Sequence, residues 1–191
     1  MSVLDKLRGR VSGASLRVGR SASRVMPSPT AWTATGLFFS LLAAALFATG
    51  HPLYGVLGGL AVLVSGLFDI VDGAVARATN RISKRGAFLD STMDRVGESA
   101  IYFGILLGNT TAPWLVFLAL AASLLVSYAR AKADALSVSL AGVGIGERSE
   151  RLIVIAAAGL LGLLPWGVVV VAALALVTFV ERVGRVTASL K

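Results

Sequence analysis

Long apolar segments separated by short polar connections run through most of the chain. From residue 31 onward, apolar stretches of about 20 residues alternate with connections that contain glycine, proline or charged side chains. An α-helix of that length crosses the hydrocarbon core of a membrane. Pro165 is expected to mark a tight turn between the last two stretches. The pattern predicts six transmembrane helices, at residues 31–49, 52–76, 86–108, 114–136, 147–164 and 166–185.

The N-terminal segment, residues 1–26, has a different pattern. Its basic residues are interleaved with valine and leucine, and it has no long apolar run. Such a segment is typical of an amphipathic helix that lies in the headgroup layer of a membrane. Its glycines leave a disordered basic tail as the alternative. We therefore predict an all-α polytopic membrane protein, with an amphipathic juxtamembrane helix at residues 1–26 and a six-helix domain at residues 27–191.

The amino-acid composition agrees with a membrane protein. The chain is 56% apolar and only 15% charged, which is too apolar for a soluble domain of 191 residues. It contains no cysteine, which excludes disulfides and thiolate metal sites. The single histidine, His51, falls in the turn after the first predicted helix and is expected at the surface.

The distribution of lysine and arginine predicts the orientation in the membrane. All but one of the 18 basic residues lie in the N-terminal segment, in the connections 77–86 and 130–151, or at the C-terminal end; the exception is Arg95. The three remaining turns contain none. By the positive-inside rule, both termini and the charged connections lie on the cytoplasmic side of the cell membrane. The net charge of +8 is then explained by anionic membrane lipids and anionic substrates rather than by nucleic acid.

Four aspartates lie in the second and third predicted helices. Asp69 and Asp72 are three residues apart, and Asp90 and Asp94 are four apart, so each pair lies on one helix face. Carboxylates that converge from two helices suit one or two hard divalent cations. Glu98 falls one turn beyond Asp94, where an ion pair with an arginine is the expected explanation. Glycines beside both aspartate pairs and basic residues between them complete the pattern of a phosphoryl-transfer site.

The spacing of these residues resembles the signature of the CDP-alcohol phosphotransferase family. The segment reads Asp69-x-x-Asp72-Gly73-x-x-Ala76-Arg77, then eight residues, then Gly86-x-x-x-Asp90-x-x-x-Asp94. Aspartates that only cap helices and pair with nearby arginines are the alternative. The resemblance implies an enzyme that transfers a phosphatidyl-type group from a CDP-linked lipid to an alcohol and releases CMP. It also favours a homodimer.

The resemblance implies a role for each matching residue. The metal would be Mg²⁺ or Mn²⁺, with two ions expected, and its ligands would be Asp69, Asp72, Asp90 and Asp94. Asp94 would also act as the general base that accepts the proton of the alcohol. The CDP group would be bound by Gly73, Ala76, Arg77 and Gly86.

The start of the first helix adds two residues to the expected CDP site. The segment Pro29-Thr30-Ala31-Trp32-Thr33-Ala34-Thr35-Gly36 is similar to the family's Pro-Asn-x-x-Thr-x-x-Gly segment, which lies beside the nucleotide. Thr30 and Thr33 are therefore expected near CDP. Thr30 stands where the family has asparagine, and its hydroxyl can still donate and accept a hydrogen bond. An N-cap is the alternative role for Thr30.

The second half of the chain carries more basic residues than orientation requires. Because arginine binds phosphate oxygens bidentately, this surplus suggests an acceptor with its own phosphate. The arrangement Ser127-x-x-Arg130-Ala131-Lys132-Ala133-Asp134, a glycine-containing loop and Glu147-Arg148-x-x-Arg151-Leu152 is similar to the branch of the family that uses inositol phosphate. By that match the acceptor phosphate would be bound by Ser127, Arg130, Arg151, Arg182 and Arg185. Arginines that only face lipid headgroups are the alternative.

Two other functions fit parts of the pattern. A phosphatidylglycerophosphate synthase would use the same aspartates with glycerol 3-phosphate as the acceptor. A divalent-cation transporter would also place carboxylates in a membrane, although here they gather at one face. The donor lipid could be CDP-diacylglycerol or CDP-archaeol, because either tail contacts only apolar helix surface.

Overall fold

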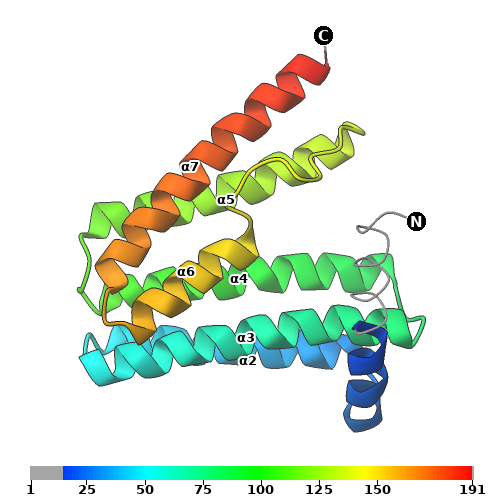
Figure 1. Ribbon diagram of the computed structural model, residues 1–191, viewed down its shortest axis with the longest axis horizontal. Coiled ribbons are helices and arrows are strands. Elements are labelled where there is room, and N and C mark those ends of the chain that lie inside the picture. Colours follow the sequence, from blue (N-terminus) through cyan, green and yellow to red (C-terminus); the bar gives the residue numbers. More distant parts are fainter. Residues whose placement is uncertain (1–14, 191) are drawn as a thin grey trace, which may run out of the picture. The chain divides into compact units, whose positions relative to one another are not determined.

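The computed structural model describes residues 15–190, and over this range the chain is all-α with no strand (Figure 1). An N-terminal helix at residues 15–25 precedes six longer helices. These are α2 (Pro29–Ala48), α3 (Pro52–Ala78), α4 (Lys84–Leu107), α5 (Pro113–Ala135), α6 (Arg148–Leu160) and α7 (Leu164–Ser189). Residues 1–14 of the predicted amphipathic segment lie outside the described range, and the amphipathic helix stays a prediction.

Each predicted apolar segment corresponds to one of the helices α2 to α7, but the last turn differs from the prediction. α6 ends at Leu160, and Gly162 adopts a φ of 70° in the turn that follows. The Leu163 N–H donates to the Ala158 carbonyl at 2.7 Å, which closes the end of α6. Pro165 lies in the first turn of α7, where its missing N–H costs no helical hydrogen bond. The prediction of a turn at Pro165 was therefore wrong.

Four of the helices are long and apolar enough to cross a membrane: α2, α3, α5 and α7. α4 is long, but its first half carries ionisable side chains. α6 has 13 residues and extends about 20 Å, less than the roughly 30 Å of a hydrocarbon core. The count of six spans stays a prediction.

The chain consists of two compact units. Among the described residues, the first comprises residues 15–39 and Val64–Val96, and the second comprises Ser40–Leu63 and residues 97–190. The predicted domain boundary at residue 27 stays a prediction.

An aromatic stack organises the first unit. The ring of Phe68 on α3 stacks between Trp32 and Phe39 on α2, with ring centroids 5.5 and 5.4 Å apart. Gly36 of α2 faces Phe68, and a Cβ on this glycine would lie 3.4 Å from the Phe68 Cβ, an ordinary van der Waals distance. The stack therefore fixes α2 beside the stretch of α3 that begins the predicted metal site at Asp69.

Close helix contacts and small residues organise the second unit. Its core includes the fully buried Ile105 of α4 and Val168 of α7. A Cβ on Gly59 of α3 would lie 2.6 Å from the Ala156 carbonyl oxygen of α6, so only glycine permits this crossing. Small residues of this kind let helices of membrane proteins pack backbone to backbone.

Candidate functional site

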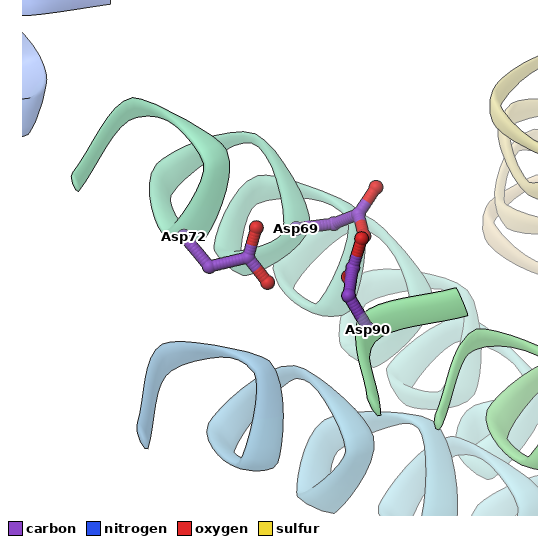
Figure 2. A group of neighbouring side chains, drawn as sticks. All are labelled: Asp69, Asp72 and Asp90. Carbon is purple, nitrogen blue, oxygen red and sulfur yellow. The ribbon is translucent and has the colours of Figure 1, made fainter. Parts of the chain in front are cut away.

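Three of the four predicted aspartates converge in the first unit. Asp69 and Asp72 extend from α3 and Asp90 extends from α4, and their carboxylates point toward one another (Figure 2). One oxygen from each lies within 4.8 Å of the others. Asp72 is the most enclosed of the three, with 6% of the residue exposed. Asp69 and Asp72 thus lie on one face of α3, as their spacing predicted, and we name Asp69, Asp72 and Asp90 the aspartate triad.

Thr33 of α2 orients one member of the aspartate triad. Its hydroxyl donates to the Asp72 Oδ2 at 2.8 Å and also lies 3.2 Å from the Pro29 carbonyl oxygen. A hydroxyl that donates to one carboxylate oxygen leaves the other free to face a cation. Thr33 was predicted from the family resemblance as a CDP contact, and this second role was not foreseen.

Asp94 lies outside the aspartate triad. It is one helical turn beyond Asp90 on α4, and its side chain is 16% exposed. Arg95 forms an ion pair with it at 3.3 Å. Asp94 was predicted both as a metal ligand and as the general base, but its carboxylate is not among the three that form the aspartate triad.

A cavity of about 480 Å³ adjoins the aspartate triad within the first unit. Asp72 and Asp90 line it. All of the residues predicted to bind CDP line it as well: Thr30, Thr33, Gly73, Ala76, Arg77 and Gly86. Three stretches of sequence thus meet around one space large enough for a ligand of moderate size.

Six further residues outside the predicted CDP set also line the cavity. They are Ser28, Pro29, Arg81, Ile82, Ser83 and Ala87. The Arg81 Nη1 donates to the Pro27 carbonyl at 3.0 Å, which joins the α3–α4 connection to the start of α2. The Ser83 hydroxyl accepts a hydrogen bond from the Gly86 N–H at 3.0 Å and caps α4. The Ser83 cap could have been recognised from its place before a helix, whereas the Arg81 contact depends on the tertiary fold.

The end of α3 shapes the connection that carries these residues. Asn80 adopts a φ of 54°, a left-handed conformation that asparagine tolerates better than most residues. The Arg81 N–H donates to the Ala76 carbonyl at 3.0 Å, which completes a helix-ending motif. The chain therefore reverses within a few residues, and α4 begins close enough to bring Asp90 to the aspartate triad.

The donors of the aspartate triad fit a hard divalent cation. Three carboxylates from two helices offer oxygen ligands close together, and Thr33 orients one of them. Carboxylate oxygens without thiolates or imidazoles favour Mg²⁺, Mn²⁺ or Ca²⁺ over softer metals. The residues present therefore suit the predicted metal.

The residues predicted to bind the acceptor phosphate all lie in the second unit, and Arg151 is the most enclosed of them. It is 1% exposed and forms a bidentate ion pair with Glu98, at 2.8 and 2.9 Å. Its remaining terminal nitrogen donates to the Gly146 carbonyl at 2.6 Å. The expectation that Glu98 pairs with an arginine is confirmed.

Arg182 is also held by protein acceptors. It is 2% exposed, and its three nitrogens donate to the Val143 carbonyl, the Val126 carbonyl and Glu147 at 3.1, 3.0 and 2.9 Å. Glu147 also pairs with Arg130 at 3.3 Å, so one carboxylate joins two of the predicted residues.

The glycine-containing loop before α6 is fixed by these contacts and by one more. The Gly146 N–H donates to the Thr178 hydroxyl at 2.8 Å, while Arg151 holds the Gly146 carbonyl. Ser127 donates to the Ser123 carbonyl at 3.2 Å, and Arg185 is exposed on α7. Of the predicted set, Arg130 and Arg185 are the exposed residues.

Comparisons with known proteins agree with the site. The family model described as CDP-alcohol phosphatidyltransferase matches residues 26–180. An archaetidylinositol phosphate synthase of Pyrococcus horikoshii is 38% identical over 181 residues, which cover 95% of each chain.

A solved relative has the same fold. The crystal structure of Mycobacterium tuberculosis phosphatidylinositol phosphate synthase with CDP-DAG bound is 28% identical, covers 90% of this chain and 92% of that one, and has a TM-score of 0.74. Its complex with manganese and citrate covers 91% and 88% and has a TM-score of 0.78. The long apolar helices, the match over most of the chain and these relatives identify a membrane enzyme that belongs to the CDP-alcohol phosphatidyltransferase family.

Proposed function

We propose that this enzyme transfers the phosphatidyl-type group of a CDP-linked lipid to a hydroxyl of inositol phosphate and releases CMP. The observation that carries the proposal is the aspartate triad beside a cavity lined by every residue of the expected CDP site. The inositol phosphate acceptor is supported by the names of the relatives from Pyrococcus and Mycobacterium. The name of the Pyrococcus relative refers to an archaetidyl product, and the Mycobacterium structure contains CDP-DAG. The donor is therefore CDP-diacylglycerol or CDP-archaeol.

The metal site would be formed by the aspartate triad. We propose Mg²⁺ or Mn²⁺, with two ions and with Asp94 as an additional ligand. Divalent cations bound here would neutralise the pyrophosphate charge and make CMP a better leaving group. Thr33 would keep the Asp72 carboxylate in the orientation that such binding requires.

The donor nucleotide would occupy the cavity. Gly73 and Gly86 present bare backbone to it, so a bulky group can approach α3 and α4 closely. Arg77 can form a charge-assisted hydrogen bond to a phosphate oxygen. Thr30 and Thr33 offer hydroxyls from α2.

The acceptor hydroxyl would attack the phosphorus atom that carries the lipid. As the new P–O bond forms, the bond to the CMP oxygen breaks, and the hydroxyl proton must leave. We propose that the Asp94 carboxylate accepts this proton. Its position outside the aspartate triad, one turn beyond Asp90, supports this role.

The acceptor site would be formed by Ser127, Arg130, Arg151, Arg182 and Arg185. Within it, the exposed Arg130 and Arg185 are the members we propose to contact the phosphate. Arg151 and Arg182 would act as positioning residues, because their guanidinium groups hold the loop through Gly146 and Glu147. A polytopic homodimer with the site on the cytoplasmic side of the cell membrane completes the proposal.

The test is CMP release by the purified enzyme in detergent with Mg²⁺, a CDP-linked lipid and one of three acceptors. Inositol phosphate should give faster turnover than free inositol or glycerol 3-phosphate. A preference for glycerol 3-phosphate would favour a phosphatidylglycerophosphate synthase instead. The family assignment argues against a divalent-cation transporter, and CMP release in this assay would exclude that function.

Arg130→Ala should raise the KM for inositol phosphate by roughly ten- to a hundred-fold, because a charge-assisted contact is lost. The KM for the CDP-linked lipid should not change. Lys132→Ala removes the same charge from an exposed residue of the same helix and is the matched control. Equal effects of both substitutions would refute a specific phosphate contact.

A further inference from the structure

The N-terminal helix, residues 15–25, packs against α3 inside the first unit. Gly19 is buried at the crossing. A Cβ on Gly19 would overlap the Ala74 carbonyl oxygen and would lie 2.9 Å from the Ala78 Cβ. Because the nearest obstacle is backbone, the overlap could not be relieved by a side-chain rotation. Only glycine permits this contact between the two helices.

The crossing coincides with the part of α3 that lines the cavity. Ala74 and Ala78 lie on either side of Arg77 in the sequence, and Gly73 directly precedes Ala74. Both Gly73 and Arg77 line the cavity. The N-terminal helix therefore packs against the segment of α3 that carries the residues proposed to bind the CDP-linked lipid.

Ser15 extends the same contact by one helical turn. It lies four residues before Gly19 and hence on the same face of the N-terminal helix. The Arg77 Nη2 donates to the Ser15 Oγ at 2.9 Å. This hydrogen bond joins residues 62 positions apart in the chain.

Gly73 leaves room for the Arg77 guanidinium group against the backbone of α3. A Cβ on Gly73 would lie 3.3 Å from the Arg77 Nη1 and 3.7 Å from its Nη2, so the guanidinium group lies over bare backbone one turn before it. An exposed arginine samples many rotamers and loses conformational entropy when it binds a ligand. A hydrogen bond that already fixes the arginine side chain reduces this loss. The hydrogen bond to Ser15 therefore restricts the direction in which the Arg77 guanidinium group points, and Gly73 provides the space for it.

We infer that Ser15 and Gly19 are positioning residues for the donor site: Gly19 seats the N-terminal helix on α3, and Ser15 orients Arg77 toward the pyrophosphate of the CDP-linked lipid. This inference rests on the proposed role of Arg77 in donor binding. It gives the N-terminal helix a part in substrate affinity, in addition to any contact with the membrane surface.

Ser15→Ala tests the hydrogen bond. The KM for the CDP-linked lipid should rise about two- to ten-fold, the range expected for one hydrogen bond, while the KM for inositol phosphate stays constant. Ser15→Thr retains the hydroxyl and should restore the wild-type value. Ser21→Ala, at an exposed position of the same helix, is the matched control. A loss in Ser15→Ala that Ser15→Thr does not restore would overturn the role of the hydroxyl.

Gly19→Ala tests the close packing of the N-terminal helix against α3. The added methyl group should displace the N-terminal helix and raise the same KM at least as much as Ser15→Ala does. Gly66→Ala is the control, because a Cβ on Gly66 of α3 would meet no atom within 4 Å. Unchanged donor KM in Gly19→Ala would overturn the inference.

A double-mutant cycle with Arg77→Ala separates this inference from the proposed function. If Arg77→Ala leaves the donor KM unchanged, the proposed role of Arg77 fails, and the positioning role fails with it. If Arg77→Ala raises the donor KM but Ser15→Ala does not, only the positioning inference is overturned. In the supporting result, Ser15→Ala has no further effect in the Arg77→Ala background, because the residue through which it acts is gone. Additive effects would instead show that Ser15 acts independently of Arg77.

Discussion

Replacing Arg151 with alanine should destabilise the enzyme strongly, because it leaves a buried carboxylate without its cation. Arg151 and Glu98 are each 1% exposed, and the two contacts between them are 2.8 and 2.9 Å long. The substitution also removes the donor to the Gly146 carbonyl at 2.6 Å. An ion pair buried to this extent owes its stability to the pairing itself, since neither group is solvated.

The expected magnitude follows from the burial. Removal of one partner of a buried pair costs about 3–5 kcal/mol. For a chain of this size, each kcal/mol lowers the melting temperature by roughly 2–4 °C, so a decrease of roughly 6–20 °C is expected. Arg185→Ala removes an exposed arginine and should change stability by no more than about 0.5 kcal/mol.

Thermal unfolding in detergent measures the effect, and a compensating double substitution tests its cause. Glu98→Leu combined with Arg151→Met removes both charges and should recover most of the lost stability, because apolar replacements of a buried pair are often neutral or stabilising. The Gly146 carbonyl would still lack its donor, which leaves a cost of about 1–3 kcal/mol.

A melting temperature of Arg151→Ala equal to that of Arg185→Ala would refute the reasoning, since a surface arginine and a buried one would then be equivalent. The double variant also informs the acceptor site. If it is stable but its KM for inositol phosphate is raised, Arg151 has a positioning role in acceptor binding. If that KM is unchanged, the role of Arg151 is confined to stability.

Three further predictions concern the first unit. Asp69→Asn should abolish CMP release and weaken Mn²⁺ binding measured by titration, with membrane insertion intact; near-normal activity would contradict the metal assignment. Asp94→Asn should lower turnover about 100-fold or more while binding of the CDP-linked lipid persists, and loss of that binding would contradict the role of Asp94 as the general base. Thr33→Val should weaken Mn²⁺ binding about 10- to 100-fold, because the donor to its carboxylate partner is lost. Thr35→Val is the control for it, since that hydroxyl donates only to a backbone carbonyl of its own helix among the contacts described.

Local spacing determined the first unit to a large extent. Asp69 and Asp72 share a helix face because they are three residues apart, and any helix through this segment presents both carboxylates together. Apolar segment length likewise predicted the helices, and the signature placed Gly73, Arg77 and Gly86 around one cavity. The helices and the shared face of the aspartates depend on helical periodicity and a short connection, which the sequence contains directly, whereas the CDP-site residues were assigned by the family resemblance.

The tertiary structure decided which partners the long charged side chains take. The sequence indicated an arginine for Glu98, but Arg151 is 53 residues away, and several other arginines were equally available by composition. The contacts of Arg77 with Ser15 and of Arg182 with Glu147 also join distant segments. An arginine side chain reaches over several ångströms in many rotamers, so its partner depends on which helices pack together and which carboxylates that packing buries. The close helix crossing at Gly19 also depends on the tertiary structure. A glycine in a basic segment allows two helices to pack closely only when another helix lies against it.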